Sequence, residues 1–180
     1  MQLEKKLGRA RRWIFLLALL VLSFDQASKS WAVSYLESRS AIKVIGDFLK
    51  FNHTTNSGAA FNLGENFTVF LTVFALIVTT GLVIFARKVI DLRWAIGFGA
   101  LLGGVLGNLT DRVFRDPHFL HGHVVDFIQI PRWPIFNIAD IAITLSGVWI
   151  TYLLIKDVEP FAKFGDRRDE SDDESRKSEL

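Results

Sequence analysis

A run of nineteen residues without a charged side chain, "FTVFLTVFALIVTTGLVIF" at 67–85, most constrains what this 180-residue chain can fold into. A helix of about 20 apolar residues crosses the ~30 Å hydrocarbon core of a bilayer, so the run predicts a transmembrane helix. Two more apolar stretches follow at 94–109 and 135–155. A fourth span is expected near 13–33, where an apolar run continues into "DQASKSWAV". The pattern predicts an all-α polytopic membrane protein with four transmembrane helices.

Lysine and arginine are unevenly distributed around these spans. Of the 21 Lys and Arg residues, 14 lie in the first twelve residues, the 86–93 loop and the 156–180 tail, and 7 lie elsewhere. Positive residues are enriched on the cytoplasmic side of membrane proteins. Both termini are therefore expected in the cytoplasm, with the 34–66 and 110–134 loops outside. The sequence pI near 9.0 then reflects topology and does not indicate nucleic acid as a partner.

Composition divides the chain into one membrane domain at 1–160 and a charged tail at 161–180, which we expect to be disordered because it mixes both charge signs and is poor in apolar residues. The chain has no cysteine, which excludes disulfides, thiol nucleophiles and cysteine-based metal sites. Between Gly and Asn breaks in the 34–66 loop, a strand is expected around Asp47–His53. No loop is large enough for a soluble catalytic domain, so any chemistry must take place at the membrane.

Three glycines in "GALLGGVLG" recur at every fourth position, at Gly99, Gly103 and Gly107. They share one face of the predicted helix, and small residues at this spacing let a second helix approach closely. We interpret them as packing residues that fix the position of the "NLTDR" segment that follows.

Two aspartates, Asp126 and Asp140, stand among apolar residues. Asn137 as N-cap and Asp140 at the third helical position would explain Asp140 as ordinary helix-start chemistry. "VVDFI" offers no cap pattern for Asp126, which could instead pair with Arg112 or Arg132. Ionisable residues at membrane depth usually have a function. The residue types alone leave catalysis or transport and structural support equally open.

Other polar residues are spaced to share helix faces. Asn108, Asp111 and Arg112 are three and four positions apart, which predicts either a helix-end ion pair or an Asn and an Arg presented to a polar substrate group. Asp25 and Lys29 are also four apart and predict an internal salt bridge.

Three histidines in "HFLHGH", His118, His121 and His123, invite comparison with a zinc site. Metal binding demands fixed geometry, and a glycine-containing loop does not orient the three rings. We interpret them as surface loop histidines and expect no metal.

The two acids have a defined chemistry if the loop carrying Asp126 folds over the start of the helix that carries Asp140. Like charges at close range cannot both ionise, so such a pair shares one proton. The ionised member takes a proton from water, and the protonated member donates a hydrogen bond to the scissile carbonyl and later helps the amine leave. This is peptide hydrolysis without a covalent intermediate, a metal or a cofactor.

Five blocks resemble the lipoprotein signal peptidases (signal peptidase II) of bacteria and occur in that family's order. They are "FDQASK" (24–29), "NSGAAF" (56–61), "GGVLGNLTDRV" (103–113), "VVDF" (124–127) and "FNIAD" (136–140). The resemblance implies an aspartic endopeptidase of the bacterial cytoplasmic membrane. Such an enzyme removes the signal peptide of prolipoproteins, cutting on the N-terminal side of the diacylglyceryl-modified cysteine. The partners implied are these substrates and membrane lipid.

The resemblance also implies roles for individual residues. Asp126 and Asp140 match the catalytic pair. The substrate-site positions are matched by Asn56, Gly58, Asn108, Arg112 and Asn137. Structural support is assigned to Asp25, Lys29 and Asp111, and Asp111 is expected to support Arg112. The family further implies a small outer β-element from the 34–66 loop, a mobile segment between the third and fourth helices, and an active site near the outer leaflet.

Two other interpretations remain open from the sequence. The same acids could serve as a relay in a small proton-coupled transporter, although the chain is short for one and shows no discontinuous-helix repeat. Alternatively, the chain could be a non-enzymatic membrane scaffold whose glycine face is its purpose.

Overall fold

The structure, a computed structural model, describes residues 2–58 and 65–162. Within them it has four helices and three strands: α1 (Gln2–Leu36), β1 (Ile42–Ile45), β2 (Leu49–Asn56), α2 (Glu65–Ala86), α3 (Leu92–Phe114), β3 (Val124–Gln129) and α4 (Ile138–Ile155). The expected C-terminal tail lies outside the described residues, apart from its first two positions.

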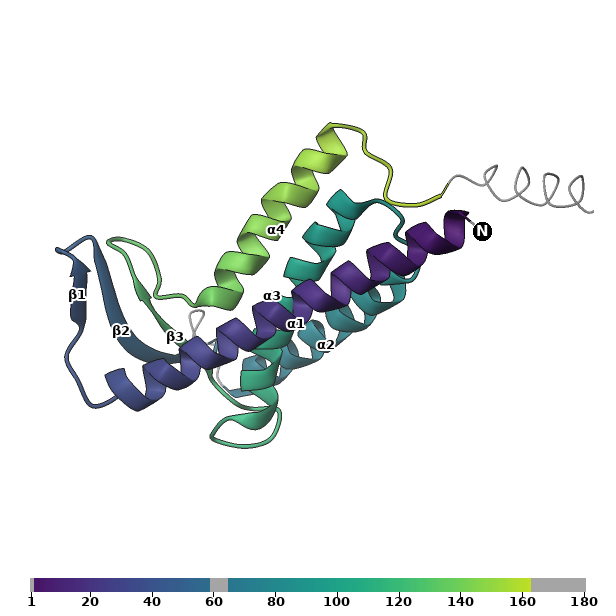
Figure 1. Cartoon of the computed structure of the whole chain (residues 1–180). Coiled ribbons are helices and arrows are strands. Elements are labelled where there is room, and N and C mark those ends of the chain that lie inside the picture. The colour runs from purple at the N-terminus through teal and green to yellow at the C-terminus, as the bar shows by residue number, and fades with distance from the viewer. Residues whose placement is uncertain (1, 59–64, 163–180) are drawn as a thin grey trace, which may run out of the picture.

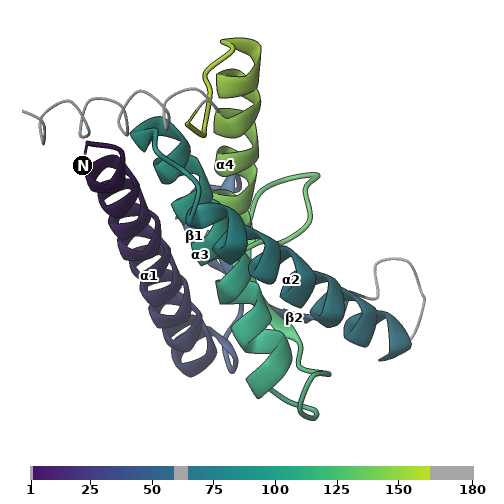
Figure 2. The same ribbon diagram turned by 90° about the vertical axis from the view of Figure 1, so that its right-hand side faces the viewer.

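Helix α3 occupies the centre of the helical layer. It contacts α1, α2 and α4, whereas α1 and α2 hardly touch. Figure 2 shows α1 and α2 on either side of α3, and Figure 1 shows α4 rising from the middle of the molecule and diverging from α1. The residues at the end of α3 therefore meet the other helices and the sheet at one place.

Three helices are long and apolar enough to cross a membrane: Thr68–Ala86 within α2, Leu92–Phe114 and Ile138–Ile155. They correspond to three of the four expected spans. Within the described residues, α1 does not meet the same criterion. At 35 residues it is the longest helix, and it buries Asp25 and Lys29 within its length. Its crossing of the membrane stays a prediction.

The three strands form one antiparallel sheet in the order β1-β2-β3. The strand expected around Asp47–His53 is β2, which forms a hairpin with β1. The third strand, β3, was not predicted. It comes from the 110–134 loop, whereas the sequence indicated a β-element only in the 34–66 loop. The register places Thr54 opposite Asp126 and Asn56 opposite Val124. The sheet thus brings Asn56 of one loop beside Asp126 of the other.

One face of this sheet covers the last turns of α1. Val125 and Phe127 of β3 are buried against Ala32 and Leu36, and the Trp31 ring contacts Phe127 edge-on with centroids 6.1 Å apart. Successive side chains of a strand point to opposite faces. Because its two neighbours face α1, Asp126 points to the other face.

The glycine spacing has the packing role predicted for it. A Cβ atom at Gly103 would lie 2.7 Å from the carbonyl oxygen of Ala18, and one at Gly107 would lie 2.5 Å from Oδ2 of Asp25. Both separations are too short for a side chain, so α3 approaches α1 at backbone contact.

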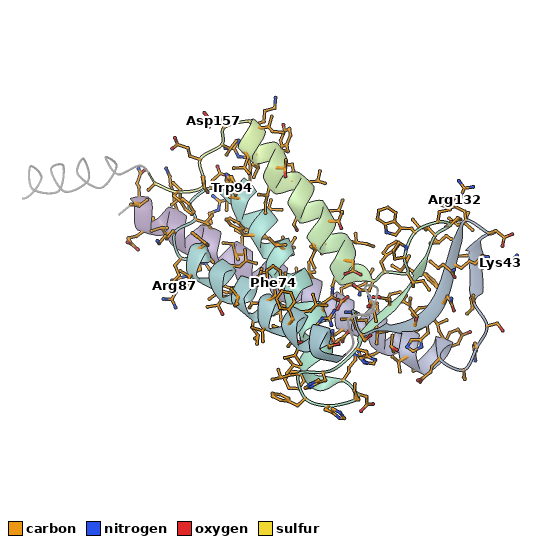
Figure 3. The ribbon with its side chains drawn as sticks, turned by 180° about the vertical axis from the view of Figure 1, so that it is seen from behind. Lys43, Phe74, Arg87, Trp94, Arg132 and Asp157 are labelled. Atoms are coloured by element: carbon orange, nitrogen blue, oxygen red, sulfur yellow. The ribbon has the colours of Figure 1, made fainter. Side chains whose placement is uncertain are left out.

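The sheet lies at one end of the molecule, and both ends of the described chain lie at the other. In Figure 3, Lys43 and Arg132 lie at the sheet end, and Arg87 and Asp157 lie at the other. The N-terminus of α1 is also at the end away from the sheet (Figure 1). There, Phe161 forms an isolated bridge with Val89 just after α2. Both ends of the described chain therefore lie on the same side of the helical layer.

We predict opposite effects for two glycine-to-alanine substitutions in helices. Gly103→Ala should lower the free energy of unfolding by about 1–3 kcal/mol, because its methyl group meets the α1 backbone. Gly81→Ala, with nothing within 4 Å of its Cβ position, should be neutral or stabilise by up to about 1 kcal/mol through helix propensity. Thermal unfolding in detergent measures both. Equal melting temperatures for the two variants would contradict the close approach of α1 and α3.

Candidate active site

Helix α4 begins with a reciprocal capping arrangement. Asn137 is the N-cap and Asp140 the third helical residue, as expected. The Asp140 backbone N–H donates to Asn137 Oδ1 at 2.9 Å, and the Asn137 backbone N–H donates to Asp140 Oδ2 at 3.2 Å. These bonds satisfy two helix-terminal donors and place the Asp140 carboxylate at the positive end of the helix dipole.

Asp126 lies beside this cap and is 2 % exposed. Asn137 Nδ2 donates to its Oδ1 at 2.6 Å, and Asn56 Nδ2 donates to its Oδ2 at 3.1 Å. Asn137 therefore contacts both acids, Asp126 through its amide group and Asp140 through its backbone. The structure thus brings together two carboxylates fourteen positions apart, and they meet through an amide.

Asn108 on α3 completes the hydrogen-bonded ring around the acids. Its Nδ2 donates to Asp140 Oδ1 at 2.8 Å. Its Oδ1 accepts from Asn137 Nδ2 at 3.2 Å and from Lys29 Nζ at 2.9 Å. Because the Lys29 ammonium bonds to the amide oxygen of Asn108, the NH₂ group of this amide faces Asp140.

Asn56 is fixed in a similar way at the end of β2. The backbone N–H of Gly58 donates to Asn56 Oδ1 at 2.8 Å, so the amide nitrogen is directed to Asp126. Gly58 has φ +83°, a left-handed conformation that glycine adopts without strain. Asn56 and Gly58 thus form a local turn at the edge of the site. The last three residues of the expected "NSGAAF" block, 59–61, lie outside the described residues.

A buried ion cluster lies next to the site and contacts the segments that carry the two acids. The Lys29 ammonium is fully buried and lies 2.8 Å from Asp25 Oδ2, the predicted salt bridge, and 2.9 Å from Asp111 Oδ2. Asp25 Oδ1 accepts the backbone N–H of Ala139 at 2.9 Å, and Asp111 Oδ2 accepts that of Val125 at 3.1 Å. The three charges therefore join α1 and α3 to the first turn of α4 and to β3.

Sequence reasoning missed two members of this cluster. Gln26 donates to both Asp25 and Asp111, each at 3.2 Å. Arg115 pairs with Asp111 through Nε at 2.7 Å. Asp111 was expected to support Arg112, but its ion-pair partners are Lys29 and Arg115. The i,i+4 spacing of Asp111 and Arg115 was the available signal for this pair.

Arg112 itself is left with a free donor. Its Nη1 is buried and, among the described residues, has no hydrogen-bond partner. The guanidinium lies within electrostatic range of Asp126 and Asp140. A buried unpaired donor costs free energy unless a ligand satisfies it. Arg112 is therefore placed to receive an acceptor from outside the chain.

Burial raises the pKa of Asp126 from its usual 3.8 to about 6, and the nearby charge of Asp140 acts in the same direction. Hydrogen bonds from Asn56 and Asn137 favour the ionised form and limit the rise in this pKa. Below about pH 6, Asp126 therefore holds a proton beside Asp140.

The loop histidines are not assembled into one cluster. The His118 and His121 rings lie 5.7 Å apart, whereas His123 lines a cleft behind the sheet. Across residues 2–58 and 65–162, no three or more His, Asp or Glu side chains are arranged to hold a metal ion.

Comparison with known proteins gives this geometry its context. A family model described as signal peptidase (SPase) II matches residues 17–156. The chain belongs to the signal peptidase II family. It is thus a peptidase, and the family match favours hydrolysis over the transporter and scaffold interpretations.

Relatives and solved structures agree with this assignment. The chain is 45 % identical over 158 residues to a lipoprotein signal peptidase of Streptomyces coelicolor, covering 87 % of this chain and 78 % of the relative. It is 39 % identical over 147 residues to that of Mycobacterium leprae, covering 82 % and 73 %. A bacterial membrane enzyme solved by the in meso method at 1.9 Å resolution matches with a TM-score of 0.72 and 32 % identity, covering 81 % of this chain and 94 % of that one.

The raised pKa of Asp126 predicts a pH-dependent stability difference. Between pH 3.8 and about 6 the folded chain holds more protons at this site than the unfolded chain, so its contribution to stability falls as pH rises through that window. Asp126→Asn should therefore gain stability relative to the original chain between pH 4 and pH 7, by up to about 3 kcal/mol. Thermal unfolding across this range measures it, with exposed Asp157→Asn as control. Parallel pH profiles for Asp126→Asn and the original chain would contradict the buried, raised carboxyl.

Proposed function

We propose that Asp126 and Asp140 are the catalytic pair of a lipoprotein signal peptidase. In this proposal the enzyme removes the signal peptide of bacterial prolipoproteins on the N-terminal side of the diacylglyceryl-modified cysteine. The observation that carries the proposal is the contact of Asn137 with both carboxylates. It holds the two acids in one site, and within the described residues neither carboxylate forms a direct ion pair.

Their surroundings suggest which acid carries the shared proton. Asp140 accepts an amide N–H from Asn108 and a backbone N–H from Asn137, and it stands in the first turn of α4. Asp126 is the more deeply buried, with a pKa raised to about 6. In the proposed ground state Asp126 is protonated and Asp140 is the general base.

The hydrolytic steps follow from this distribution. Asp140 takes a proton from water as the water oxygen attacks the scissile carbonyl carbon. Asp126 donates its proton to the carbonyl oxygen, which becomes the hydroxyl of a tetrahedral intermediate. Asp140 then passes its proton to the leaving nitrogen as the C–N bond breaks. A hydroxyl proton returns to Asp126, which leaves a new carboxyl group and a free amine.

Arg112 is proposed to bind the substrate. Its unpaired Nη1 can donate to a carbonyl or ester oxygen near the acids. Asn56 and Gly58 border the same site from the sheet and can contact the peptide backbone. The sulfur-linked diacylglyceryl chains would stay in lipid, so cleavage takes place at the membrane interface.

The proposed orientation has four spans, both termini in the cytoplasm and the acids near the outer leaflet of the cytoplasmic membrane. Two observations support it. Fourteen of the 21 Lys and Arg residues lie in the segments assigned to the cytoplasm. The described chain also begins and ends on the side away from the sheet.

Substitution of either acid should abolish cleavage. We expect Asp126→Asn and Asp140→Asn each to lower the cleavage rate of a diacylglyceryl-cysteine precursor by at least 10²–10⁴-fold, the usual contribution of general acid–base catalysis. The assay uses purified protein in detergent, with unfolding monitored in parallel. Asp47→Asn, which removes an exposed carboxylate paired with Lys43 and Lys50, is the matched control. Substantial cleavage by either folded site variant would reject this pair.

Arg112→Gln tests the proposed substrate contact. Loss of one charge-assisted hydrogen bond should lower kcat/KM by roughly 10–100-fold with little change in melting temperature, because Nη1 has no partner within the described chain. Arg132→Gln, which removes an exposed arginine at the sheet end, is the control. An unchanged kcat/KM for Arg112→Gln, or an equal loss in both variants, would remove Arg112 from the substrate site.

A further inference from the structure

A second polar cleft lies behind the sheet and has no part in the proposed hydrolysis. Its volume is about 530 Å³, and it lies between the end of α1, strand β2 and the segment that follows α3. The charged and titratable residues that line it are Glu37, His53, Arg115, Asp116 and His123. It is thus a mixed cleft that offers both cationic donors and carboxylates.

The sheet separates this cleft from the catalytic pair. Val125 and Thr55 line the cleft and are paired across β2 and β3. Asp126, the next residue along β3, points to the opposite face. A ligand in the cleft would therefore not touch the catalytic carboxylates.

One nitrogen that belongs to a residue lining the cleft is buried without a partner. Nε2 of His53 is inaccessible and makes no hydrogen bond within the described residues. His53 lies where the β2–β3 register shifts between Phe51 and Thr54, and such bulges redirect side chains. An unsatisfied buried nitrogen is unfavourable unless something else bonds to it. A ligand seated in the cleft that His53 lines would supply this missing partner.

Arg115 supplies a second point of attachment. Its Nε is engaged by Asp111 at 2.7 Å, so the guanidinium is anchored while its two terminal nitrogens can serve the cleft that it lines. Planar guanidinium groups bind phosphate through two parallel hydrogen bonds. Two carboxylates that also line the cleft, Glu37 and Asp116, suit a positive group.

The position of the cleft favours a lipid. Arg115 directly follows α3, a candidate membrane span that ends at Phe114. Phe114 and Phe119 are 77 % and 66 % exposed, with ring centroids 6.5 Å apart. Exposed aromatic rings at the end of a span are typical of the membrane–water interface. The cleft therefore opens at headgroup level.

We propose that this cleft binds the headgroup of a zwitterionic phospholipid such as phosphatidylethanolamine. The phosphate meets Arg115, His53 and His123. The ammonium meets Glu37 and Asp116. The acyl chains extend along the apolar surface beside Phe114. This site is independent of the proposed peptidase mechanism, and its occupancy would anchor the outer loops to the bilayer surface.

Lipid binding to the full-length protein tests the proposal. Delipidated protein in detergent is titrated with phosphatidylethanolamine, phosphatidylglycerol, diacylglycerol or soluble phosphoethanolamine, and bound lipid is counted by native mass spectrometry. We expect phosphatidylethanolamine to bind at least fivefold more tightly than the other three. His53→Gln and Glu37→Gln should each weaken it by roughly tenfold, the effect of one charge-assisted hydrogen bond. His118→Gln removes a loop histidine that does not line the cleft and should bind normally.

Several results would overturn the site. Equal binding of diacylglycerol would show that the headgroup is not recognised, and equal binding of phosphatidylglycerol would show that the carboxylates play no part. Equal binding of phosphoethanolamine would replace a lipid site with a soluble-ligand site. Unchanged lipid binding by folded His53→Gln or Glu37→Gln would show that the substituted side chain does not contact the headgroup. Precursor cleavage in lipid-poor detergent should persist in both variants, which separates failure here from failure of the peptidase proposal.

Discussion

The structure depends most on the buried ammonium of Lys29. A buried charge is costly unless it is closely paired, and Lys29 lies between Asp25 of α1 and Asp111 of α3. The free oxygen of Asp25, Oδ1, accepts the backbone N–H of Ala139 in the first turn of α4, and Oδ2 of Asp111, which pairs with Lys29, also accepts that of Val125 in β3. Lys29 also donates to Asn108, which sets the direction of the amide facing Asp140. One ion cluster thus positions the segments that carry both proposed catalytic acids.

The acids are held together by amides, and this choice has an electrostatic consequence. Asn137 and Asn56 hydrogen-bond Asp126 but carry no charge. They fix the carboxylate without cancelling its repulsion from Asp140, and this repulsion favours the protonated form of Asp126. A lysine or arginine in place of Asn137 or Asn56 would favour the ionised form of both carboxylates, so that no protonated acid would be left to donate. Lys29 is kept one residue away, behind Asn108, and Arg112 keeps a donor unpaired.

Sequence reasoning succeeded where local rules decide the outcome. Apolar runs predicted α2, α3 and α4, the Asn-x-x-Asp pattern predicted the cap at Asn137, and glycine spacing predicted the α1–α3 contact. It failed where partners come from distant segments. Strand β3 is six residues long and forms only because β2 pairs with it. The choice of Arg115 over Arg112 by Asp111 depends on side-chain direction at the end of α3. The cleft at His53 exists only after the sheet packs on α1.

The site requires one particular register in the pairing of β2 with β3. Alternate residues of β3 serve different environments: Val125 and Phe127 fill the apolar layer over α1, while Asp126 enters the hydrophilic ring. If the pairing of β3 with β2 shifted by one residue, these roles would be exchanged. The Asp126 carboxylate would face the apolar layer over α1, and Val125 would face the polar groups of the site. The register of β2 shifts between Phe51 and Thr54, directly before Thr54 pairs with Asp126. Chemistry in this molecule is therefore sensitive to chain length in both outer connections, even where no side chain there touches a reactant.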